Sequence, residues 1–165
     1  MKYLLDNFTG KKANPATTID IKSKGSSLVF SFIAEESSLF SYSKKNNDDL
    51  WKGSVVEVFL DLGDKDFYYE FEVAPNGAMF VAKKYPDHLE FIKNDFFKST
   101  TSVEGNTYKV EMEIDLSKLR ITNYIKYNCF RIENERSKEK SDNLEALSPT
   151  LCETFHVRDK FINLN

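Results

Sequence analysis

Alternation of apolar and charged residues is the feature that most limits what this chain can fold into. From Tyr108 to Asp115, every second residue is apolar and every residue between is charged. Side chains of a β-strand point alternately to opposite faces, so this pattern predicts a strand with one face on a core and one in water. Residues 69–73 repeat the pattern, and residues 56–61 follow it with Phe59 as the exception.

Further strands are predicted where apolar, β-branched and aromatic residues form short runs. These runs are residues 17–22, 27–34, 77–84, 96–103 and 126–133. The run 27–34 is almost wholly apolar, which is typical of a central strand with both faces covered. Turn-forming residues punctuate the runs at 24–26, 63–66, 75–77 and 104–106. Residues 115–119 can form one helical turn with Asp115 as its N-cap.

These patterns together predict an all-β fold for the 165 residues. We expect two antiparallel sheets packed as a β-sandwich of the jelly-roll or immunoglobulin-like kind, with at most one or two short helical turns. No repeat or linker divides the sequence, so one domain over residues 1–165 is expected. The polar stretches 41–49 and 137–143 are predicted to be exposed loops.

Charge and hydropathy exclude several classes of partner. The formal net charge is −3, which argues against nucleic acid, since binding phosphates needs a basic face. No apolar run approaches the roughly 20 residues that span a bilayer, so no membrane partner is expected. The first residues lack the apolar core and cleavage site of a signal peptide. We therefore expect a cytoplasmic protein, or an extracellular one if a leader has been removed.

The reactive side chains give little basis for catalysis. Cys129 and Cys152 lack metal-site spacing and are expected to be reduced thiols packed as small hydrophobes, with one disulfide as the alternative. No catalytic motif is present. Glu70 and Glu72 share a strand face and are predicted to be solvated, because a glycosidase needs one acid of raised pKa in an enclosed cleft. The sequence predicts a protein that is not an enzyme.

Four segments, in this order, carry a resemblance to a known family: 49–61, 69–77, 108–131 and 147–161. The chain resembles the family 9 carbohydrate-binding modules and the related DOMON-like sandwiches. This resemblance implies a non-catalytic sandwich of two sheets that binds a small saccharide or the end of a glycan. In sugar-binding members two Trp side chains clamp the sugar, whose C–H face stacks on an aromatic plane.

Three site residues carry over from the first two segments. Trp51 matches the first clamp aromatic and is expected to be the stacking platform, with a core Trp at the sandwich edge as the alternative. Glu57 matches the acid that accepts hydrogen bonds from sugar hydroxyls, with a solvated carboxylate as the alternative. Asn76 is a ligand candidate, although its Pro-Asn-Gly setting favours a turn former.

Three more candidates come from the later segments. Arg131 matches an Arg that ends a strand motif of the family. Glu133 lies two residues later on the same strand face, so an ion pair between the two is the alternative to ligand contacts. His156 belongs to a matching Phe-His motif, where a hydrogen-bonded structural histidine is favoured over a ligand.

The sequence also departs from the family. Leu147 stands where the second clamp Trp is expected, and Ser54 stands where an Asp is usual. Trp51 is the only Trp in the chain, so a clamp of two Trp cannot form, and Tyr42 or Tyr85 is a candidate for the second wall. A non-catalytic interaction or structural domain with a degenerate sugar site is therefore the alternative function.

Cofactors remain unassigned from the sequence. Structural calcium is a family feature, and residues 46–49 and 61–66 offer hard oxygen ligands, but neither has the spacing of a known loop motif. Solvated acidic turns are expected there. Some DOMON-like sandwiches hold haem b, which is an unfavoured alternative here. Its nominal ligand candidates are Met79, Met112, His88 and His156, of which Met112 is predicted to be core.

Overall fold

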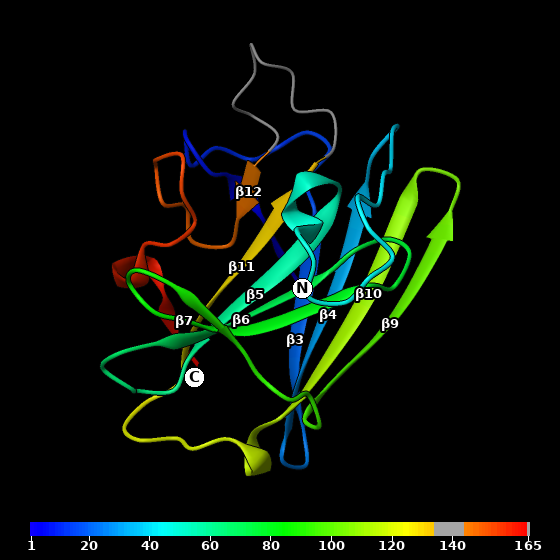
Figure 1. Ribbon diagram of the computed structural model, residues 1–165. Helices are drawn as coiled ribbons and strands as arrows, with labels where there is room; N and C mark the ends of the chain where they lie inside the picture. Colours follow the sequence, from blue (N-terminus) through cyan, green and yellow to red (C-terminus); the bar gives the residue numbers. More distant parts are fainter. Residues whose placement is uncertain (134–143, 165) are drawn as a thin grey trace.

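The protein forms two antiparallel β-sheets stacked face to face in the computed structural model (Figure 1). The structure describes residues 1–133 and 144–164. The predicted all-β sandwich of two sheets is confirmed. The predicted loop at 137–143 lies outside the described residues, and the stretch 41–49 forms no strand.

The first sheet has five strands in the order β1-β3-β4-β10-β9. Its strands are β1 (Lys2–Tyr3), β3 (Thr18–Lys24), β4 (Ser27–Glu35), β9 (Phe97–Glu104) and β10 (Thr107–Asp115). β10, the strand with the strict alternation, pairs with β4 along its whole length. Its neighbours on either side are therefore β4 and β9.

The second sheet has eight strands in the order β2-β12-β11-β5-β6-β7-β8, with β13 paired to one end of β11. Its strands are β2 (Leu5–Asp6), β5 (Val55–Asp61), β6 (Tyr68–Val73), β7 (Met79–Lys84), β8 (Leu89–Phe91), β11 (Lys126–Ile132), β12 (Leu144–Ala146) and β13 (Ile162–Asn163). The central strands match predicted runs. The sequence does not predict β2, β8, β12 and β13, because two or three residues show no measurable alternation.

The helical content is limited to short 3₁₀ turns. These are η1 (Leu50–Lys52), η2 (Leu116–Lys118) and η3 (Arg158–Lys160). η2 is the predicted turn, and the Asp115 carboxylate caps it by accepting a hydrogen bond from the Ser117 amide. The described residues thus hold one short turn more than expected. No helix among them is long and apolar enough to cross a membrane.

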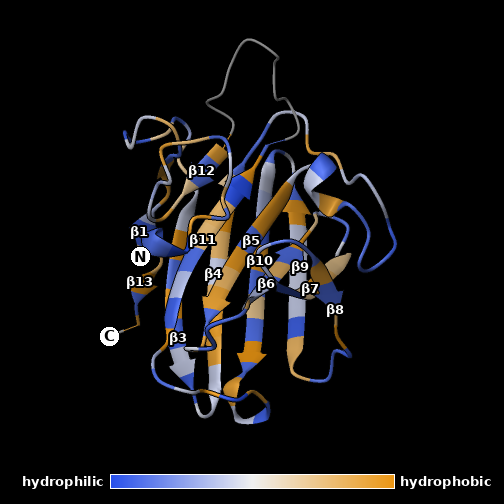
Figure 2. Cartoon of the chain, turned by 60° about the vertical axis from the view of Figure 1, so that its left-hand side comes forward, coloured by the Kyte–Doolittle hydropathy of each residue, from blue (hydrophilic) through white to orange (hydrophobic). Residues whose placement is uncertain are grey.

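Two apolar clusters lie on opposite faces of the second sheet. Hydropathy changes repeatedly along the strands in Figure 2, as alternation requires. The core between the sheets includes Phe30, Phe32, Val56, Val58, Phe71, Tyr108 and Met112. The second cluster, called here the outer-face cluster, includes Val55, Phe59, Tyr68, Phe80, Phe130, Ile132 and Phe155. Since Val55 and Phe59 alternate with Val56 and Val58 along β5, this cluster lies on the face turned away from the first sheet.

One strand prediction needs correction. The apolar run 27–34 was expected to be covered on both faces. In β4, Leu28, Phe30 and Phe32 are buried in the core, but Ile33 on the opposite face is 40% exposed. The outer face of the first sheet is open to solvent at Ile33. The end of this apolar run is therefore covered on one face only.

Candidate functional site

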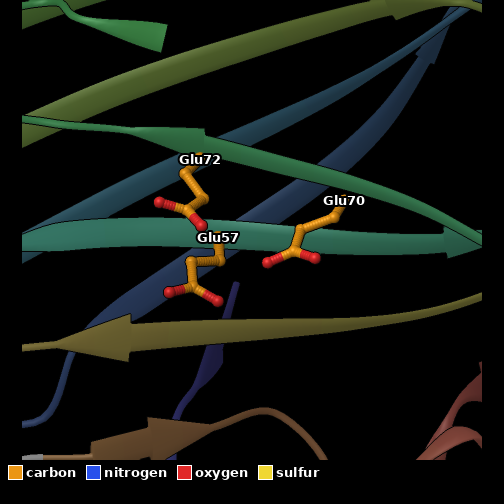
Figure 3. Close-up of side chains that lie close together, drawn as sticks. All are labelled: Glu57, Glu70 and Glu72. Atoms are coloured by element: carbon orange, nitrogen blue, oxygen red, sulfur yellow. The ribbon is translucent and has the colours of Figure 1, made fainter. Parts of the chain in front are cut away.

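Three glutamates gather on the outer face of the second sheet. Glu57 of β5 lies directly opposite Glu72 of β6. Two residues further along the same pair of strands, Phe59 lies opposite Glu70. Residues two apart on a strand share a face, so the three carboxylates project to the same side, as Figure 3 shows. One oxygen from each carboxylate lies within 4.8 Å of the other two. We call Glu57, Glu70 and Glu72 the glutamate cluster.

The glutamate cluster is buried, which corrects the sequence interpretation. The exposed fractions are 2% for Glu57, 5% for Glu70 and 1% for Glu72. Alternation predicted that these side chains would face water. Instead the outer-face cluster surrounds them, with Phe130 opposite Glu57 and Phe80 opposite Glu72 on the flanking strands. The pattern gives the face to which a side chain points, but not what covers that face.

Burial also controls the ionisation of the cluster. It raises the pKa of Glu70 to about 7, against the lowering effects of its hydrogen bond with Glu72 and the charge of Lys84. It raises the pKa of Glu72 well above the ordinary value, and the charges of Glu57 and Glu70 add to that rise. Within the described residues, Oε2 of Glu70 and Oε2 of Glu72 have no hydrogen-bond partner. Such an arrangement favours a proton, a donor or a cation at this point.

A pocket of about 350 Å³ opens over the glutamate cluster. This volume falls in the range of small-molecule sites. Trp51, from η1 just before β5, lines it and is 44% exposed. Phe91, from the edge strand β8, lines it and is 54% exposed, with its ring against that of Phe80. Two exposed aromatic rings and three buried carboxylates thus line one cavity.

Trp51 stands at the pocket and not in the core of the sandwich. The Lys52 ammonium lies 5.5 Å from the centroid of the Trp51 ring and 5.1 Å from that of the Tyr42 ring. Gly53 passes so close to the preceding loop that an added Cβ would lie 2.5 Å from the Phe40 carbonyl oxygen. The turn that carries Trp51 is therefore fixed by close backbone packing.

His156 closes one side of the pocket as a neutral ring. Its Nδ1 lies 2.6 Å from the Tyr68 hydroxyl, and its ring stacks on Phe59 at a centroid distance of 5.1 Å. Desolvation against these rings lowers the pKa of His156 to about 4, although the residue keeps an exposed edge, so at neutral pH the ring is neutral and shares a hydrogen bond with the Tyr68 hydroxyl. The favoured structural contact is present, and the ring also lines the pocket.

Arg131 lies on the opposite face of its strand, in the core between the sheets. It is 0% exposed and forms an ion pair with Glu36, which follows β4. The Tyr108 ring centroid lies 5.7 Å from its Cζ. Glu133, the partner suggested by the sequence, is half-buried just beyond the end of β11. The local spacing could not reveal Glu36, because that residue follows a strand of the other sheet.

Asn76 forms the turn between β6 and β7 and ties it to the loop before η1. Its backbone amide donates to the Ser41 hydroxyl at 3.1 Å, and its Nδ2 donates to the Ser43 carbonyl at 2.9 Å. Its Oδ1 accepts from the Ala78 amide at 3.0 Å. Neither Asn76 nor Arg131 is among the described residues that line the pocket.

The two acidic turns are solvated as expected except at Asp61, since Asp49 and Asp66 are exposed and Asp48 and Asp64 are half-buried. In the first, Asn46 and Asn47 accept hydrogen bonds from the amides of Met79 and Val81. In the second, the Asp61 carboxylate is 1% exposed and binds the Arg158 guanidinium at 2.7 Å, so it is not solvated. An arginine nearly 100 positions away in sequence covers it.

The remaining candidates fall at scattered places. Leu147 packs against the core between the sheets, so it points away from the pocket. Met112 is 0% exposed in that core, as predicted, whereas His88 lies in an exposed turn with its ring stacked on Tyr85. The haem-ligand candidates therefore do not face one space. Both cysteines are free thiols, with Cys129 buried.

Sequence reasoning missed Phe91 and the roles of Glu70 and Glu72 in the pocket. Phe91 lies in a three-residue strand too short to be recognised from its pattern. The signal for the two glutamates was present, since they share a face with Glu57 in a neighbouring strand. It became informative only when the register placed Glu57 opposite Glu72.

Comparison with known proteins decides the family. The sequence profile of carbohydrate-binding family 9 matches residues 6–145, most of the chain. The chain belongs to carbohydrate-binding family 9. A fungal protein from Arthroderma benhamiae, described as an extracellular protein, is 38% identical to this family 9 chain over 79 residues. That match covers 46% of the chain and only 36% of the fungal protein.

Solved structures share the fold of this family 9 protein. A candidate carbohydrate-binding protein from Bacteroides uniformis aligns over 97% of the chain and 83% of its own, with a TM-score of 0.77 and 17% identity. A family 9 module from Caldicellulosiruptor kristjanssonii in complex with glucose aligns over 88% of the chain and 73% of its own, with a TM-score of 0.61 and 15% identity. A complex of such a module with cellotriose aligns over 79% and 64%, with a TM-score of 0.58 and 16% identity.

Proposed function

We propose that this family 9 protein is a non-catalytic module that binds a small saccharide or the end of a glycan in the pocket over the glutamate cluster. The observation that carries the proposal is the lining of that pocket. Exposed aromatic rings and buried carboxylates converge in one cavity of about 350 Å³. A saccharide needs both, since it has apolar C–H faces and a rim of hydroxyl donors.

Trp51 and Phe91 are the proposed stacking walls. Each exposes about half of its side chain and lines the same pocket. Phe91 thereby supplies the second aromatic wall that Leu147 cannot. Tyr42, considered from the sequence for this role, instead lies beside Lys52 next to Trp51.

The glutamate cluster and His156 are the proposed polar contacts. Carboxyl oxygens accept hydrogen bonds from sugar hydroxyls, a protonated carboxyl group can also donate one, and bonds to an ionised carboxylate are the stronger ones. Glu57, the sequence candidate, lies at the pocket floor between Phe130 of β11 and Glu72 of β6. For Arg131 and Asn76 we propose a supporting role, because their contacts hold the sheets and the loop before η1. Glu133 remains a predicted contact at the end of β11.

Binding without catalysis is supported by the arrangement of the acids. A glycosidase places its two carboxyl groups on either side of the scissile bond, about 5–5.5 Å or 6.5–9.5 Å apart. Here the three carboxylates project from adjacent strands of one sheet, and their nearest oxygens lie within 4.8 Å. They form a floor under the ligand and do not flank it.

The relatives suggest the ligands to test first and the compartment. The modules from Caldicellulosiruptor kristjanssonii were solved with glucose and with cellotriose. Short gluco-oligosaccharides are therefore the first panel. The fungal relative is described as extracellular, which favours the extracellular alternative over the cytoplasmic expectation.

The test is calorimetric titration of glucose, cellobiose and cellotriose into wild type, Trp51→Ala and Phe91→Ala. Removing one stacking wall is expected to cost about 0.5–1.5 kcal/mol of binding free energy, which weakens Kd about two- to twelve-fold. Incubation of the same sugars with the protein is expected to release no shorter product.

Tyr3→Ala provides the matched control. Tyr3 is 51% exposed on β1 of the other sheet, so its removal is expected to leave Kd unchanged. If a folded wild type binds nothing across a wider glycan panel, the alternative of an interaction domain with a degenerate site gains support. Hydrolysis of any sugar in the panel would contradict the non-catalytic proposal.

A further inference from the structure

The glutamate cluster has the dimensions of a cation site. One oxygen from each of Glu57, Glu70 and Glu72 lies within 4.8 Å of the other two. Calcium binds oxygen at about 2.3–2.6 Å, so two oxygens on opposite sides of one ion lie about 4.6–5.2 Å apart. A single ion placed among the three oxygens therefore reaches all of them with small side-chain adjustments.

A second observation is that two of these buried side chains have an oxygen in need of a partner. Glu70 and Glu72 are 5% and 1% exposed, and Oε2 of each lacks a hydrogen-bond partner among the described residues. A buried carboxylate oxygen without a donor is costly, and native proteins leave few such groups. The strand register also brings like charges together, because Glu57 and Glu72 are direct cross-strand neighbours. Like charges placed directly opposite each other destabilise a strand pair unless something compensates for them.

We propose that the glutamate cluster is a calcium site on the floor of the pocket, in which Glu57, Glu70 and Glu72 each supply a carboxylate oxygen and water fills the remaining positions. Calcium accepts six to eight oxygen ligands in flexible geometry, and the pocket above leaves room for water. Magnesium demands near-ideal octahedral geometry and usually keeps several waters, so the more flexible coordination of calcium suits three carboxylates on two adjacent strands better. The site is distinct from the acidic turns 46–49 and 61–66, and it does not depend on saccharide binding.

Trp51 makes the site directly observable. It is the only Trp in the chain, and it lines the same pocket as the three glutamates. Terbium replaces calcium in oxygen sites, and its luminescence is sensitised by energy transfer from a nearby indole. Excitation of the indole is therefore expected to yield terbium emission that calcium displaces.

The experiment compares wild type with Glu72→Gln and with Glu111→Gln. The first variant keeps the shape of the side chain, replaces one proposed carboxylate ligand with the weaker, uncharged amide oxygen and relieves like-charge repulsion, so it is expected to fold. The second removes an exposed carboxylate of β10, on the other sheet, and gives the same change in net charge. Protein stripped with a chelator is then titrated with calcium, with thermal unfolding and terbium emission as the two measurements.

Calcium at about a hundred times Kd is expected to raise the Tm of wild type and Glu111→Gln by on the order of 5 °C. Glu72→Gln is expected to lose this rise and the sensitised terbium emission. An equal rise of Tm in Glu72→Gln would overturn the proposal, because the ion would then bind elsewhere. The absence of any calcium effect on wild type would overturn it too, and would indicate a cluster that holds a proton instead.

Discussion

His156 shows how much one residue depends on its surroundings. In sequence it is a histidine beside Phe155 in a family motif. In the structure it joins the outer-face cluster to the pocket, stacked on Phe59 and bonded to the Tyr68 hydroxyl. Its neutral ring shares a hydrogen bond with the Tyr68 hydroxyl, and protonation would place a charge against apolar rings.

A pH dependence follows from this environment. The folded-state pKa of His156 is lowered to about 4, below the ordinary value of 6.5, because burial disfavours the charged ring. A base with a lowered pKa gives stability that is present above pH 6.5 and is lost as the pH falls toward 4. The raised pKa of Glu70 acts with the opposite sign, since its contribution is lost as the pH rises toward 7.

The measurement is therefore the difference in free energy of unfolding between wild type and His156→Gln. Urea unfolding of wild type and His156→Gln is followed across pH 4 to 7, where the glutamine keeps an acceptor but does not titrate in this range. The stability advantage of wild type is expected to shrink steadily as the pH falls. A difference independent of pH would show that His156 does not titrate with a lowered pKa.

At the scale of elements, β10 and β6 have the same alternation but different surroundings. In β10 the outward residues Lys109 and Glu111 are exposed. In β6 every residue is buried, including Glu70 and Glu72. The difference arises because the outer face of the second sheet carries an additional apolar layer. Loops complete that layer with Leu50 of η1 and with Phe155 and Phe161 near the end of the chain.

The loop before β5 gives a prediction at this scale. In Gly53→Ala the new Cβ would lie 2.5 Å from the Phe40 carbonyl oxygen and 2.9 Å from the Tyr42 amide nitrogen, so the backbone must shift. Overpacking of this kind costs about 1–3 kcal/mol of stability. Because Trp51 is two residues away, saccharide affinity is expected to fall as well, as calorimetry can measure.

Gly105→Ala is the matched glycine control. Nothing lies within 4 Å of an added Cβ there, although φ is +59°. It is expected to cost about 1 kcal/mol through its left-handed backbone and to leave affinity unchanged. Equal affinity of Gly53→Ala and wild type would show that the close packing at Gly53 does not position Trp51.

At the scale of the whole molecule, polar contacts join segments far apart in the chain. Arg131 and Glu36 pair across the two sheets inside the core, and the Tyr108 hydroxyl donates to the Val73 carbonyl beside them. Near the start of the chain, Asn7 binds the Thr150 hydroxyl at 2.8 Å, which holds the loop that leads to His156. The pocket wall thus depends on contacts between both ends of the sequence.

The buried ion pair gives the prediction at this scale. Arg131→Met removes the cation that faces Glu36 in a fully buried position. Breaking one side of a buried pair costs about 3–5 kcal/mol, because the remaining charge loses its compensation. Urea unfolding is expected to show a loss of this size. The double variant Arg131→Met/Glu36→Gln is expected to recover part of it, and no recovery would contradict a pairwise origin.

The sequence by itself determined the strands and the class of fold. Alternation at 108–115 and 69–73 marked β10 and β6, and the N-cap at Asp115 was also readable, because these are local properties of consecutive residues. The ordered motifs around Trp51 and Glu57 indicated the family. Each of these inferences needs only residues within a few positions of one another.

Only the tertiary structure decided which polar residues share a space. Glu70 and Glu72 became a buried floor when the register set Glu57 opposite Glu72 and aromatic residues covered the face. Phe91 became a pocket wall, and Arg131 found Glu36, through contacts between distant strands. The physical reason is that a strand pattern fixes the direction of a side chain. Its burial, charge partner and pKa depend on what the rest of the chain packs against it.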